Sequence, residues 1–515
     1  MSAFNPSLPF SRSGDSESDL PIAPRVLYAI LEHASNRPDS LALQSFSASG
    51  QLPGPLTYRQ LHDTISRLAV EIRQHVQPDG VVLLKCENSS QFVAWFLAIL
   101  TAGCRVLPIH PRLAKPEVQS LAKQTGASVM IGSPEHFIDR ELMLLAVGLA
   151  SAAESGESDS ATLPQLSENG GLILQSSGTT GIAKLVFRAP KALDAVASAV
   201  AHSMRLKVGE RVIAAIPLSH SYGIDILLAT MLAGATLNIW DEFDPPSIAR
   251  ECSSGSAVVF PGVPFMFEAM SRQGPPVGPG ESSLRLAVSA GAPLPARVEQ
   301  GMATAWGIRV GQIYGATELG SVTLNDPDSP LFAPASVGLA LPGARIRVLD
   351  PRDLCSVLPC GNEGHIAVRT PAMLSGYVPD GMPELVDGYL PTGDLGQLDE
   401  QNRLFITGRA KLLIDSGGLK INPIEVESAL TQHPGVLECV VGPLPLSDTI
   451  VRLQVQFVAA DPLHPPTESE LRQHMKDRVA PYKIPRLFER VDALARSASG
   501  KVLRTSAFPG SPPPC

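Results

Sequence analysis

Apolar positions along the chain follow two alternating patterns, one with the period of a helix and one typical of buried strands. Over residues 60–75 apolar side chains recur with a 3.6-residue period, which predicts a helix. The run 81–84 is continuously apolar and predicts a buried strand. A second helix, 91–102, passes through Gly103 into another apolar run, 104–109. Helix, glycine and apolar strand in repetition predict βα units and parallel sheets.

The same alternation continues through the middle of the chain. Such a series of helices and strands predicts one large α/β domain. Residues 336–369 differ, because short alternating strands with Gly-Asn and Pro-Gly turns predict a small antiparallel or barrel-like section. The strand-like apolar runs of the large domain lie at residues 172–174, 212–217, 235–239, 257–261, 285–289 and 308–314.

The pattern changes again near Gly408, where a smaller domain of α+β type is expected. Its predicted elements are a hairpin at 411–420, helices at 423–432 and 467–479, and strands at 436–441, 452–458 and 486–491. The resulting organisation is a large N-terminal domain at 23–408, a connecting segment at 409–411 and a small C-terminal domain at 412–505. The polar ends, 1–22 and 506–515, are expected to be disordered or frayed, and 151–170 to form a surface loop.

Composition narrows the classes of protein that fit this pattern. A chain of 515 residues is too long for one compact core. The net charge of −9, with no basic block, argues against general nucleic-acid binding. The seven cysteines are scattered without a C-x-x-C pair, which favours a reduced, intracellular protein without a zinc site. Because no signal-peptide core or membrane-spanning run is found, we expect a cytoplasmic protein.

A loop rich in hydroxyl groups and glycine follows the strand at 172–174. It reads Ser176-Ser177-Gly178-Thr179-Thr180-Gly181, and Lys184 comes three residues later. Such residues expose many donors on a backbone that a ligand can approach closely, which suits a triphosphate, and Lys184 adds a point charge. The spacing is not that of a P-loop. Alone, the loop is equally compatible with an ordinary Ser/Thr/Gly connection, so the remaining motifs must decide.

Six further stretches follow this loop in a fixed order. Together with the loop they resemble the adenylate-forming superfamily, which includes acyl- and aryl-CoA synthetases, luciferases and nonribosomal-peptide adenylation domains. The resemblance extends from about Tyr58 to Lys501. The stretches are SSGTTGIAK (176–184), PLSHSYG (217–223), SAGAPLP (289–295), YGATELG (314–320), GYLPTGDLG through ITGRAK (388–411), GGLKINPIEVE (417–427) and RSASGK (496–501).

The resemblance implies activation of a carboxylate by ATP. A carboxylate is a poor electrophile, so the enzyme transfers it to AMP and must offset the charge that develops at the α-phosphate. The implied catalytic residues are Lys501, which reaches across from the small domain, His220 beside the acid pocket, and Glu318, which bridges Mg²⁺. The implied ATP- and AMP-binding residues are Ser176, Ser177, Gly178, Thr179, Thr180, Lys184, Gln312, Tyr314, Thr317, Asp394 and Arg409.

The resemblance also implies a moving small domain. Lys411 matches the hinge position about which that domain rotates between adenylation and thioester formation. Gly417, Gly418 and Lys420 match the hairpin that approaches the pantetheine of coenzyme A. Three positions depart from the family pattern: Ala183 replaces a usual proline, Leu185 a usual glycine and Asp415 a frequent basic residue. The replacements at Ala183 and Leu185 put in question whether the loop at 176–184 closes over the phosphates. The replacement at Asp415 puts in question one contact with substrate or phosphate.

The acid pocket implied by the resemblance is small and apolar. Amino-acid-activating relatives carry a Phe-Asp pair in the second motif, which this chain lacks; Asp225 is displaced by about one helical turn. Since a buried ammonium needs a paired charge, α-amino acids are disfavoured. Aryl and fatty acids both fit, and the His220-x-Tyr222 pattern favours an aryl acid. The implied lining is Tyr222, Gly223, Ser289, Ala290, Gly291, Gly315 and Ala316.

The leading hypothesis is an ATP-dependent carboxylic acid–CoA ligase that uses ATP, Mg²⁺ and CoA and forms an acyl-adenylate. An acyl-AMP ligase that loads an acyl carrier protein is the alternative. The third hypothesis is a homologue that binds ligands but does not catalyse the reaction. Such a protein would have no reason to retain all five polar motif residues. Those residues are Lys184, Glu318, Asp394, Arg409 and Lys501.

Overall fold

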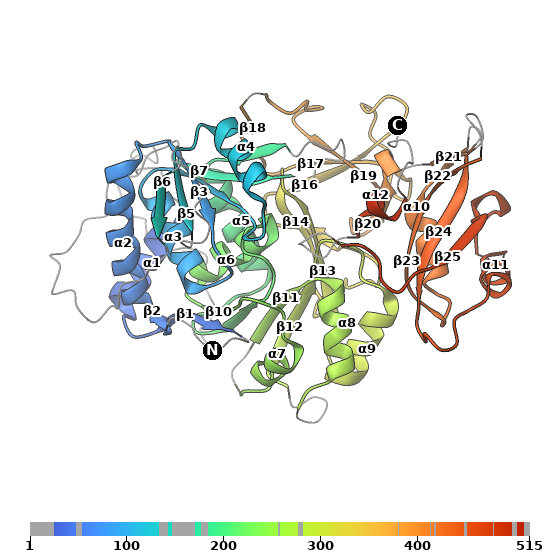
Figure 1. Ribbon diagram of the computed structural model, residues 1–515, viewed down its shortest axis with the longest axis horizontal. Coiled ribbons are helices and arrows are strands. Elements are labelled where there is room, and N and C mark those ends of the chain that lie inside the picture. The colour runs from blue at the N-terminus through green and yellow to red at the C-terminus, as the bar shows by residue number, and fades with distance from the viewer. Residues whose placement is uncertain are drawn as a thin grey trace.

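The computed structural model (Figure 1) describes residues 25–47, 54–132, 143–146, 170–176, 184–255, 258–276, 282–379, 381–412, 414–416, 419–446, 451–476, 478–496 and 502–508. The predicted disorder of 1–22 lies outside these residues, as does the predicted surface loop except for Gly170. Two large sheets and the helices around them form the N-terminal part of the molecule, and a smaller orange and red part lies at its C-terminal end (Figure 1).

The first sheet has nine strands and confirms the predicted parallel pairing in its centre. Antiparallel pairs close both of its edges. The turn between its antiparallel strands β13 and β14 carries Glu318. In sheet order the strands are β15 (Leu339–Ala340), β14 (Gly320–Asn325), β13 (Val310–Ala316), β12 (Leu284–Ser289), β11 (Val258–Gly262), β9 (Arg211–Ala214), β10 (Thr236–Trp240), β1 (Leu41–Phe46) and β2 (Leu56–Thr57).

The second sheet has seven strands and carries the glycine- and hydroxyl-rich loop. Its strand β7 leads into that loop and β8 returns antiparallel to it, so the loop connects a hairpin. The other central pairs are parallel. In sheet order the strands are β18 (Gly376–Val378), β8 (Leu185–Arg188), β7 (Gly171–Gln175), β4 (Arg105–Pro108), β3 (Val81–Lys85), β5 (Val129–Gly132) and β6 (Met143–Ala146).

Helices between and around the sheets form one continuous apolar core. The predicted helix at 60–75 begins two residues earlier, because Thr57 and Gln60 cap it reciprocally. The predicted helix at 91–102 is apolar on nearly all sides and fully buried. No described helix is long and apolar enough to cross a bilayer. The helices of this part are α1 (Arg25–Asn36), α2 (Tyr58–His75), α3 (Ser90–Thr101), α4 (Lys115–Thr125), α5 (Pro190–Ser203), α6 (Ser221–Ala233), α7 (Pro245–Glu251), α8 (Pro264–Gln273) and α9 (Ala296–Trp306).

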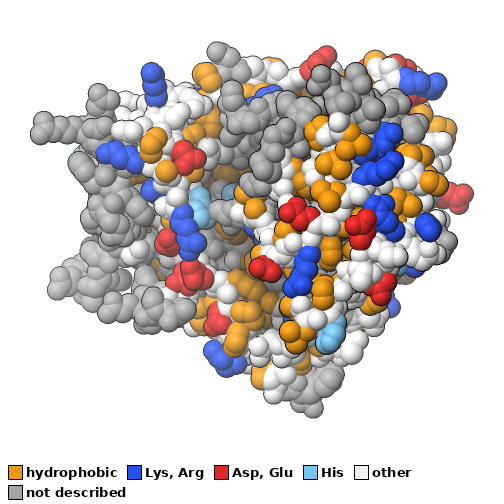
Figure 2. All heavy atoms as spheres, turned by 45° about the vertical axis from the view of Figure 1, so that its right-hand side comes forward, with side chains coloured by type: hydrophobic (Ala, Val, Ile, Leu, Met, Phe, Trp, Pro, Cys, Tyr) orange, Lys and Arg blue, Asp and Glu red, His pale blue; other side chains and the backbone are white. Residues whose placement is uncertain are grey.

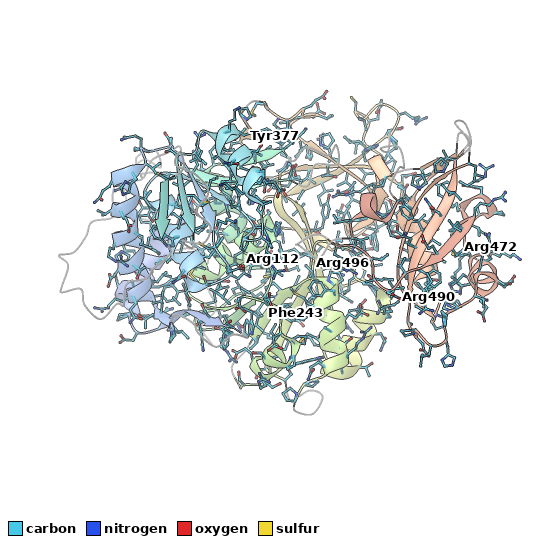
Figure 3. The ribbon with its side chains drawn as sticks, in the orientation of Figure 1. Arg112, Phe243, Tyr377, Arg472, Arg490 and Arg496 are labelled. Carbon is cyan, nitrogen blue, oxygen red and sulfur yellow. The ribbon has the colours of Figure 1, made fainter. Side chains whose placement is uncertain are left out.

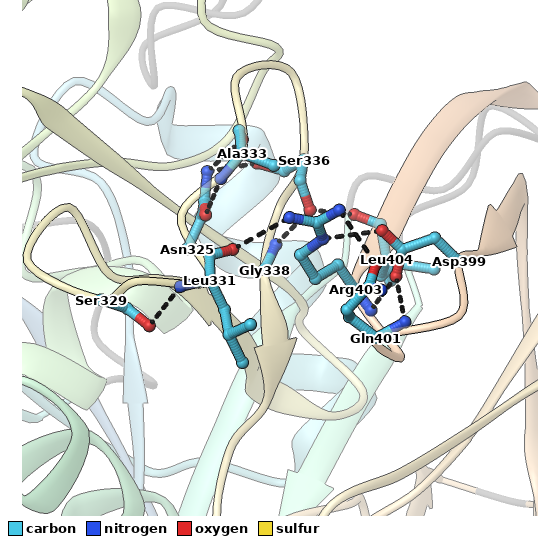
Figure 4. A network of polar contacts seen from close by, with 10 residues as sticks. All are labelled: Asn325, Ser329, Leu331, Ala333, Ser336, Gly338, Asp399, Gln401, Arg403 and Leu404. Carbon is cyan, nitrogen blue, oxygen red and sulfur yellow. Dashed lines mark hydrogen bonds and ion pairs between the residues drawn. The ribbon is translucent and has the colours of Figure 1, made fainter.

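A third sheet of four strands is antiparallel throughout, as predicted for the section that begins at residue 336. It extends beyond the predicted end at 369, since β19 and β20 complete it. Polar contacts tie it to the first sheet (Figure 4): the Ser336 hydroxyl donates to the Leu404 carbonyl at 2.9 Å, and Arg403 donates to the Leu331 carbonyl at 3.3 Å. The strands are β16 (Arg345–Leu349), β17 (Gly364–Arg369), β19 (Leu390–Leu398) and β20 (Leu404–Arg409).

The small C-terminal part has its own apolar core and the predicted α+β composition. A 3₁₀ turn, η2 (Ala410–Leu412), precedes the hairpin, which therefore begins at 414 rather than 411. Its helices end two to three residues before the predicted ends at 432 and 479. The elements are β21 (Ile414–Ser416), β22 (Leu419–Ile421), α10 (Pro423–Leu430), β23 (Val436–Pro445), β24 (Val451–Ala459), α11 (Glu468–Lys476), η3 (Pro481–Lys483), β25 (Leu487–Arg490) and α12 (Arg504–Ala507).

The prediction of a frayed tail from residue 506 is wrong for 506–508. The last helix, α12, is anchored by Arg504, whose guanidinium donates to both carboxylate oxygens of Glu427 at 2.6 and 2.7 Å. Phe508 is only 7% exposed and packs where Gly442 leaves room, because a Cβ there would lie 2.2 Å from the ring. One bidentate ion pair and one aromatic anchor therefore order a segment whose composition is typical of a loose end.

Charges on the surface show no dominant sign on the face drawn in Figure 2. Lysine and arginine side chains lie among aspartates and glutamates there. This agrees with the absence of a basic block in the sequence.

We expect Phe508→Ala to destabilise the small part by about 3–5 kcal/mol, because it removes a buried ring from a closed apolar cluster. Urea unfolding followed by limited proteolysis of residues 414–508 would measure the change. Leu463→Ala, at a side chain that is 84% exposed, is the control and should leave the midpoint unchanged. Equal midpoints for both variants would show that Phe508 anchors nothing.

Candidate active site

Three of the predicted nucleotide-binding residues meet at one carboxylate. The Tyr314 hydroxyl donates to Oδ2 of Asp394 at 2.7 Å, and Nε of Arg409 donates to Oδ1 at 2.6 Å. The pairing of β19 with β20 sets Asp394 directly opposite Arg409. Burial and the charge of Asp394 raise the pKa of Tyr314 well above its usual range, so the phenol stays a donor. Each carboxylate oxygen can accept a second hydrogen bond, which leaves capacity for a ribose hydroxyl.

Gln312 lies on the same strand, β13, but its amide is engaged within the protein. Its oxygen accepts from the Leu294 amide at 3.2 Å, and its nitrogen donates to the Ser336 carbonyl at 3.1 Å. The side chain is 7% exposed. Gln312 therefore braces the segment after β12 against the segment that connects β14 and β15, and its contact with the nucleotide stays a prediction.

Tyr377 contacts Lys184 and is influenced electrostatically by Glu318. The Lys184 ammonium lies 5.0 Å from the centre of the Tyr377 ring, on β18 (Figure 3). Burial and the negative charge of Glu318 raise the pKa of Tyr377. The Glu318 carbonyl accepts from the Leu374 amide at 2.7 Å, which fixes the turn that carries the carboxylate and its neighbour Thr317. Sequence reasoning missed Tyr377, since a lone Gly-Tyr pair carries no signal of its own.

The donor set at Glu318 suits magnesium better than a transition metal. No group of three or more His, Cys, Asp or Glu side chains gathers in the described part of the chain. Mg²⁺ takes one or two protein carboxylates and fills its shell with phosphate oxygens and water. The single carboxylate of Glu318 therefore fits Mg²⁺, whereas zinc would require three or four protein ligands.

The departure at Leu185 has a structural role. Leu185 begins β8, pairs with Gln175 across the hairpin and is 1% exposed in an apolar cluster with Ile173. The Ser176 amide donates to the Lys184 carbonyl at 2.8 Å and closes the base of the hairpin. Ser177, Gly178, Thr179, Thr180 and Ala183 lie outside the described residues. Leu185 therefore anchors the strand that returns from the loop.

A buried ion pair joins three segments that carry site residues. Arg188, on β8, donates to Oδ1 of Asp225, on α6, at 3.1 Å, and the two side chains are 0% and 1% exposed. Oδ2 of Asp225 accepts from the amide and the hydroxyl of Ser321, on β14, at 2.8 and 2.9 Å. Gly320 has a φ of +66°, and a Cβ there would lie 2.8 Å from Arg188. Both oxygens of Asp225 are thus occupied by the protein.

The predicted acid-pocket residues lie at the start of α6 and at the carboxyl ends of β12 and β13. The Tyr222 hydroxyl donates to the Val288 carbonyl at 3.2 Å, and burial raises the pKa of this phenol. Ser289 is 1% exposed, and its hydroxyl has no hydrogen-bond partner among the described residues. His220 precedes α6, and its ring centre lies 6.5 Å from that of His110.

Close backbone contacts explain two of the pocket glycines. A Cβ at Gly223 would lie 2.3 Å from the Pro217 carbonyl, and one at Gly315 would lie 2.3 Å from the Gly320 carbonyl. The segment after β12 includes Ala290, which is 6% exposed, and Gly291, which has a φ of +84°. Ala316 ends β13. The protein backbone packs tightly at these positions, so only small residues fit.

The remaining predicted residues belong to the small C-terminal part and its connection. Lys411 lies in η2 directly after β20, and Lys420 lies in β22 opposite Asp415. The structure describes only the backbone of these residues. Gly417, Gly418 and Lys501 lie outside the described residues. Arg496 and Val502, which flank the segment with Lys501, form a β-bridge.

Comparison with known proteins places this fold and site in a family. The family model described as AMP-binding enzyme matches residues 30–378, and the model described as AMP-binding enzyme C-terminal domain matches residues 425–501. The chain belongs to the AMP-binding enzyme family. The predicted membership of the adenylate-forming superfamily and the class of AMP-forming acid–thiol ligase are confirmed.

Individual relatives and solved structures align with most of the chain. A feruloyl-CoA synthase from Amycolatopsis sp is 30% identical and covers 87% of this chain and 92% of its own. ATP-bound MatB from Rhodopseudomonas palustris has a TM-score of 0.83 at 26% identity over 94% of this chain and 98% of its own. The apo form of MatB, at the same identity and coverage, has a TM-score of 0.75. o-Succinylbenzoate coenzyme A synthetase (MenE) from Bacillus subtilis, in complex with ATP and magnesium ion, has a TM-score of 0.78 at 25% identity over 93% and 98%.

We expect Arg188→Met to lower the free energy of unfolding by about 3–5 kcal/mol, because it leaves Asp225 buried without a counter-charge. Asp225→Asn in the same chain removes that charge and should restore a large part of the loss. Urea unfolding of both single variants and the double variant gives the coupling energy. Strictly additive effects would contradict a direct ion pair.

Tyr377→Leu should raise the KM for ATP about three- to fivefold, because the ring no longer orients the Lys184 ammonium. Tyr377→Phe keeps the ring and should behave like the parent enzyme. Phe488→Leu is the matched control, since Arg472 lies at the same 5.0 Å from the Phe488 ring in the small C-terminal part. A similar rise in KM for the Phe488 and Tyr377 variants would show that the effect is not specific to Lys184.

Proposed function

We propose that this enzyme ligates a carboxylic acid of the aryl class, apolar and without charge apart from its carboxylate, to coenzyme A. The reaction uses ATP and Mg²⁺ and passes through an acyl-adenylate. The observation that carries the acid class is the occupancy of Asp225, whose two oxygens are taken by Arg188 and Ser321. The pocket residues otherwise carry no formal charge, so nothing in the proposed lining would pair with a substrate ammonium.

The aryl preference rests on an aromatic residue of the proposed lining and on the relatives. Tyr222 places a partly buried ring near the start of α6. An aryl acid gains an aromatic contact with such a ring that a fatty acid does not gain. The feruloyl-CoA and o-succinylbenzoate enzymes both take their names from aromatic acids.

Each polar motif residue has a proposed task in the two half-reactions. Lys184 and the loop at 176–180 hold the phosphates, and Asp394 with Arg409 holds the ribose. The carboxylate of the acid attacks the α-phosphorus and pyrophosphate leaves; Mg²⁺ on Glu318 would offset the charge on the leaving phosphates. Lys501 stabilises the adenylation transition state. Rotation at Lys411 then brings the segment at 417–420 toward the site, and the thiol of CoA displaces AMP.

The test is pyrophosphate release with cinnamate, phenylalanine and decanoate, each with ATP and Mg²⁺. Cinnamate and phenylalanine share a carbon skeleton but differ in both the ammonium group and the double bond. 3-Phenylpropanoate is therefore added to the panel, because it differs from phenylalanine only in the ammonium group and isolates the effect of that charge. We expect release with cinnamate, little with phenylalanine and an intermediate rate with decanoate. A faster rate with decanoate would overturn the aryl assignment, and no release with any acid would overturn adenylation.

Addition of CoA separates the two possible acceptors. Conversion of the adenylate to cinnamoyl-CoA is the expected result, whereas an adenylate that CoA does not discharge would favour an acyl carrier protein. Lys501→Ala serves as the control for the assigned chemistry: it should suppress pyrophosphate release and spare thioester formation from supplied cinnamoyl-AMP. Equal loss of both half-reactions would contradict the role of Lys501.

A further inference from the structure

One arginine of the large N-terminal part reaches the small C-terminal part. Arg297, in the first turn of α9, donates to the Leu437 carbonyl, on β23, at 2.7 Å. The same guanidinium holds Glu268, on α8, through contacts of 2.8 and 3.3 Å. Glu268 already holds the Arg297 guanidinium in place within the large N-terminal part. The hydrogen bond to Leu437 therefore requires little further ordering of the Arg297 side chain.

In the small C-terminal part, charged residues continue from Leu437 to the residues that flank Lys501. Glu438 follows Leu437 and pairs with Arg496. Arg496 lies at the border of the two parts (Figure 3) and bridges to Val502, so these two residues form the base of the segment that contains Lys501. The electrostatic influence of both Arg496 and Arg297 reaches Glu438, since each lowers its pKa against the effect of burial. Positive and negative groups therefore alternate from α8 and α9 to the base of the Lys501 segment.

The chain as a whole fits a nucleotide-bound relative better than the apo form of that relative. MatB fits this chain with a TM-score of 0.83 in its ATP-bound form and 0.75 in its apo form, at equal identity and coverage. The contact between Arg297 and Leu437 thus occurs in a chain whose overall fit is better to the ATP-bound form.

We propose that Arg297 is a positioning residue that holds the small C-terminal part in the orientation for adenylation. The inference rests on the proposed function, in which Lys501 acts only in that orientation. A single charge-assisted hydrogen bond at a partly exposed site favours the orientation and still allows release. Arg297 touches no reacting atom, and it acts through the position of Arg496 and the segment that follows.

The test compares Arg297→Ala with Arg272→Ala. Both arginines pair with Glu268, at 2.8 and 2.7 Å, and only Arg297 has a described contact with the small part. We expect Arg297→Ala to lower the kcat of acid-dependent pyrophosphate release about tenfold with little change in the KM for ATP. Thioester formation from supplied cinnamoyl-AMP and CoA should be unchanged or faster. Arg272→Ala should leave both half-reactions at the parent rate.

Small-angle scattering of the same variants provides a readout that needs neither the acid nor turnover. Arg297→Ala should increase the radius of gyration of the ATP-bound protein, and Arg272→Ala should not. If the parent enzyme activates no acid, the proposed function fails while the scattering result still decides the role of Arg297. Equal loss of both half-reactions, equal effects of the two variants, or an unchanged radius of gyration in Arg297→Ala would overturn the proposal.

Discussion

The site depends on one ion pair that is fully withdrawn from water. Removing two charges from solvent costs several kcal/mol per ion, and hydrogen bonds on both oxygens of Asp225 offset part of that cost. On the other side, Nε and Nη2 of Arg188 have no hydrogen-bond partner among the described residues, so the guanidinium depends on Asp225 for its compensation. A well-packed apolar pair would stabilise the fold as well. The ion pair in addition fixes the relative position of three segments, because its contacts join β8, which follows the loop at 176–184, α6, which follows His220, and β14, which follows Glu318. Three motifs far apart in sequence thereby keep one relative position.

The same ion pair also shapes the chemistry of the acid pocket. A carboxylate at Asp225 that faced the pocket would favour a cationic substrate. Turned toward Arg188 and Ser321, it is neutralised and leaves a pocket whose polar groups are hydroxyls and backbone. Close packing at Gly320 is part of this arrangement, since any side chain there would displace the guanidinium. In the proposed function, one contact therefore provides structural support and also determines the substrate class.

The periodicity of apolar residues predicted the α/β architecture, because burying one face of a helix or strand requires apolar residues at regular spacing in the sequence. Motif order predicted that Tyr314, Asp394 and Arg409 bind the nucleotide. The structure brings these three side chains together, and their contact with the nucleotide stays a prediction. Single contacts left no such imprint. The order of residues 506–508 depends on Arg504 finding Glu427, and the contact of Arg297 depends on where α9 meets β23. Such pairs join positions more than seventy residues apart, and no local pattern announces them.

Tyr377 shows why a polar site can be held open by an aromatic ring. Among the ion pairs of the described residues, none joins Lys184 to Glu318, although both lie near Tyr377. A direct ion pair would occupy the two groups that the proposed function assigns to the phosphates and the metal, and it would have to break before either could bind. A ring face attracts the ammonium more weakly than a phosphate does, so it can orient Lys184 and still yield it to the nucleotide. In the proposed function, the Tyr377 ring thus gives Lys184 a contact that ATP replaces without first breaking an ion pair.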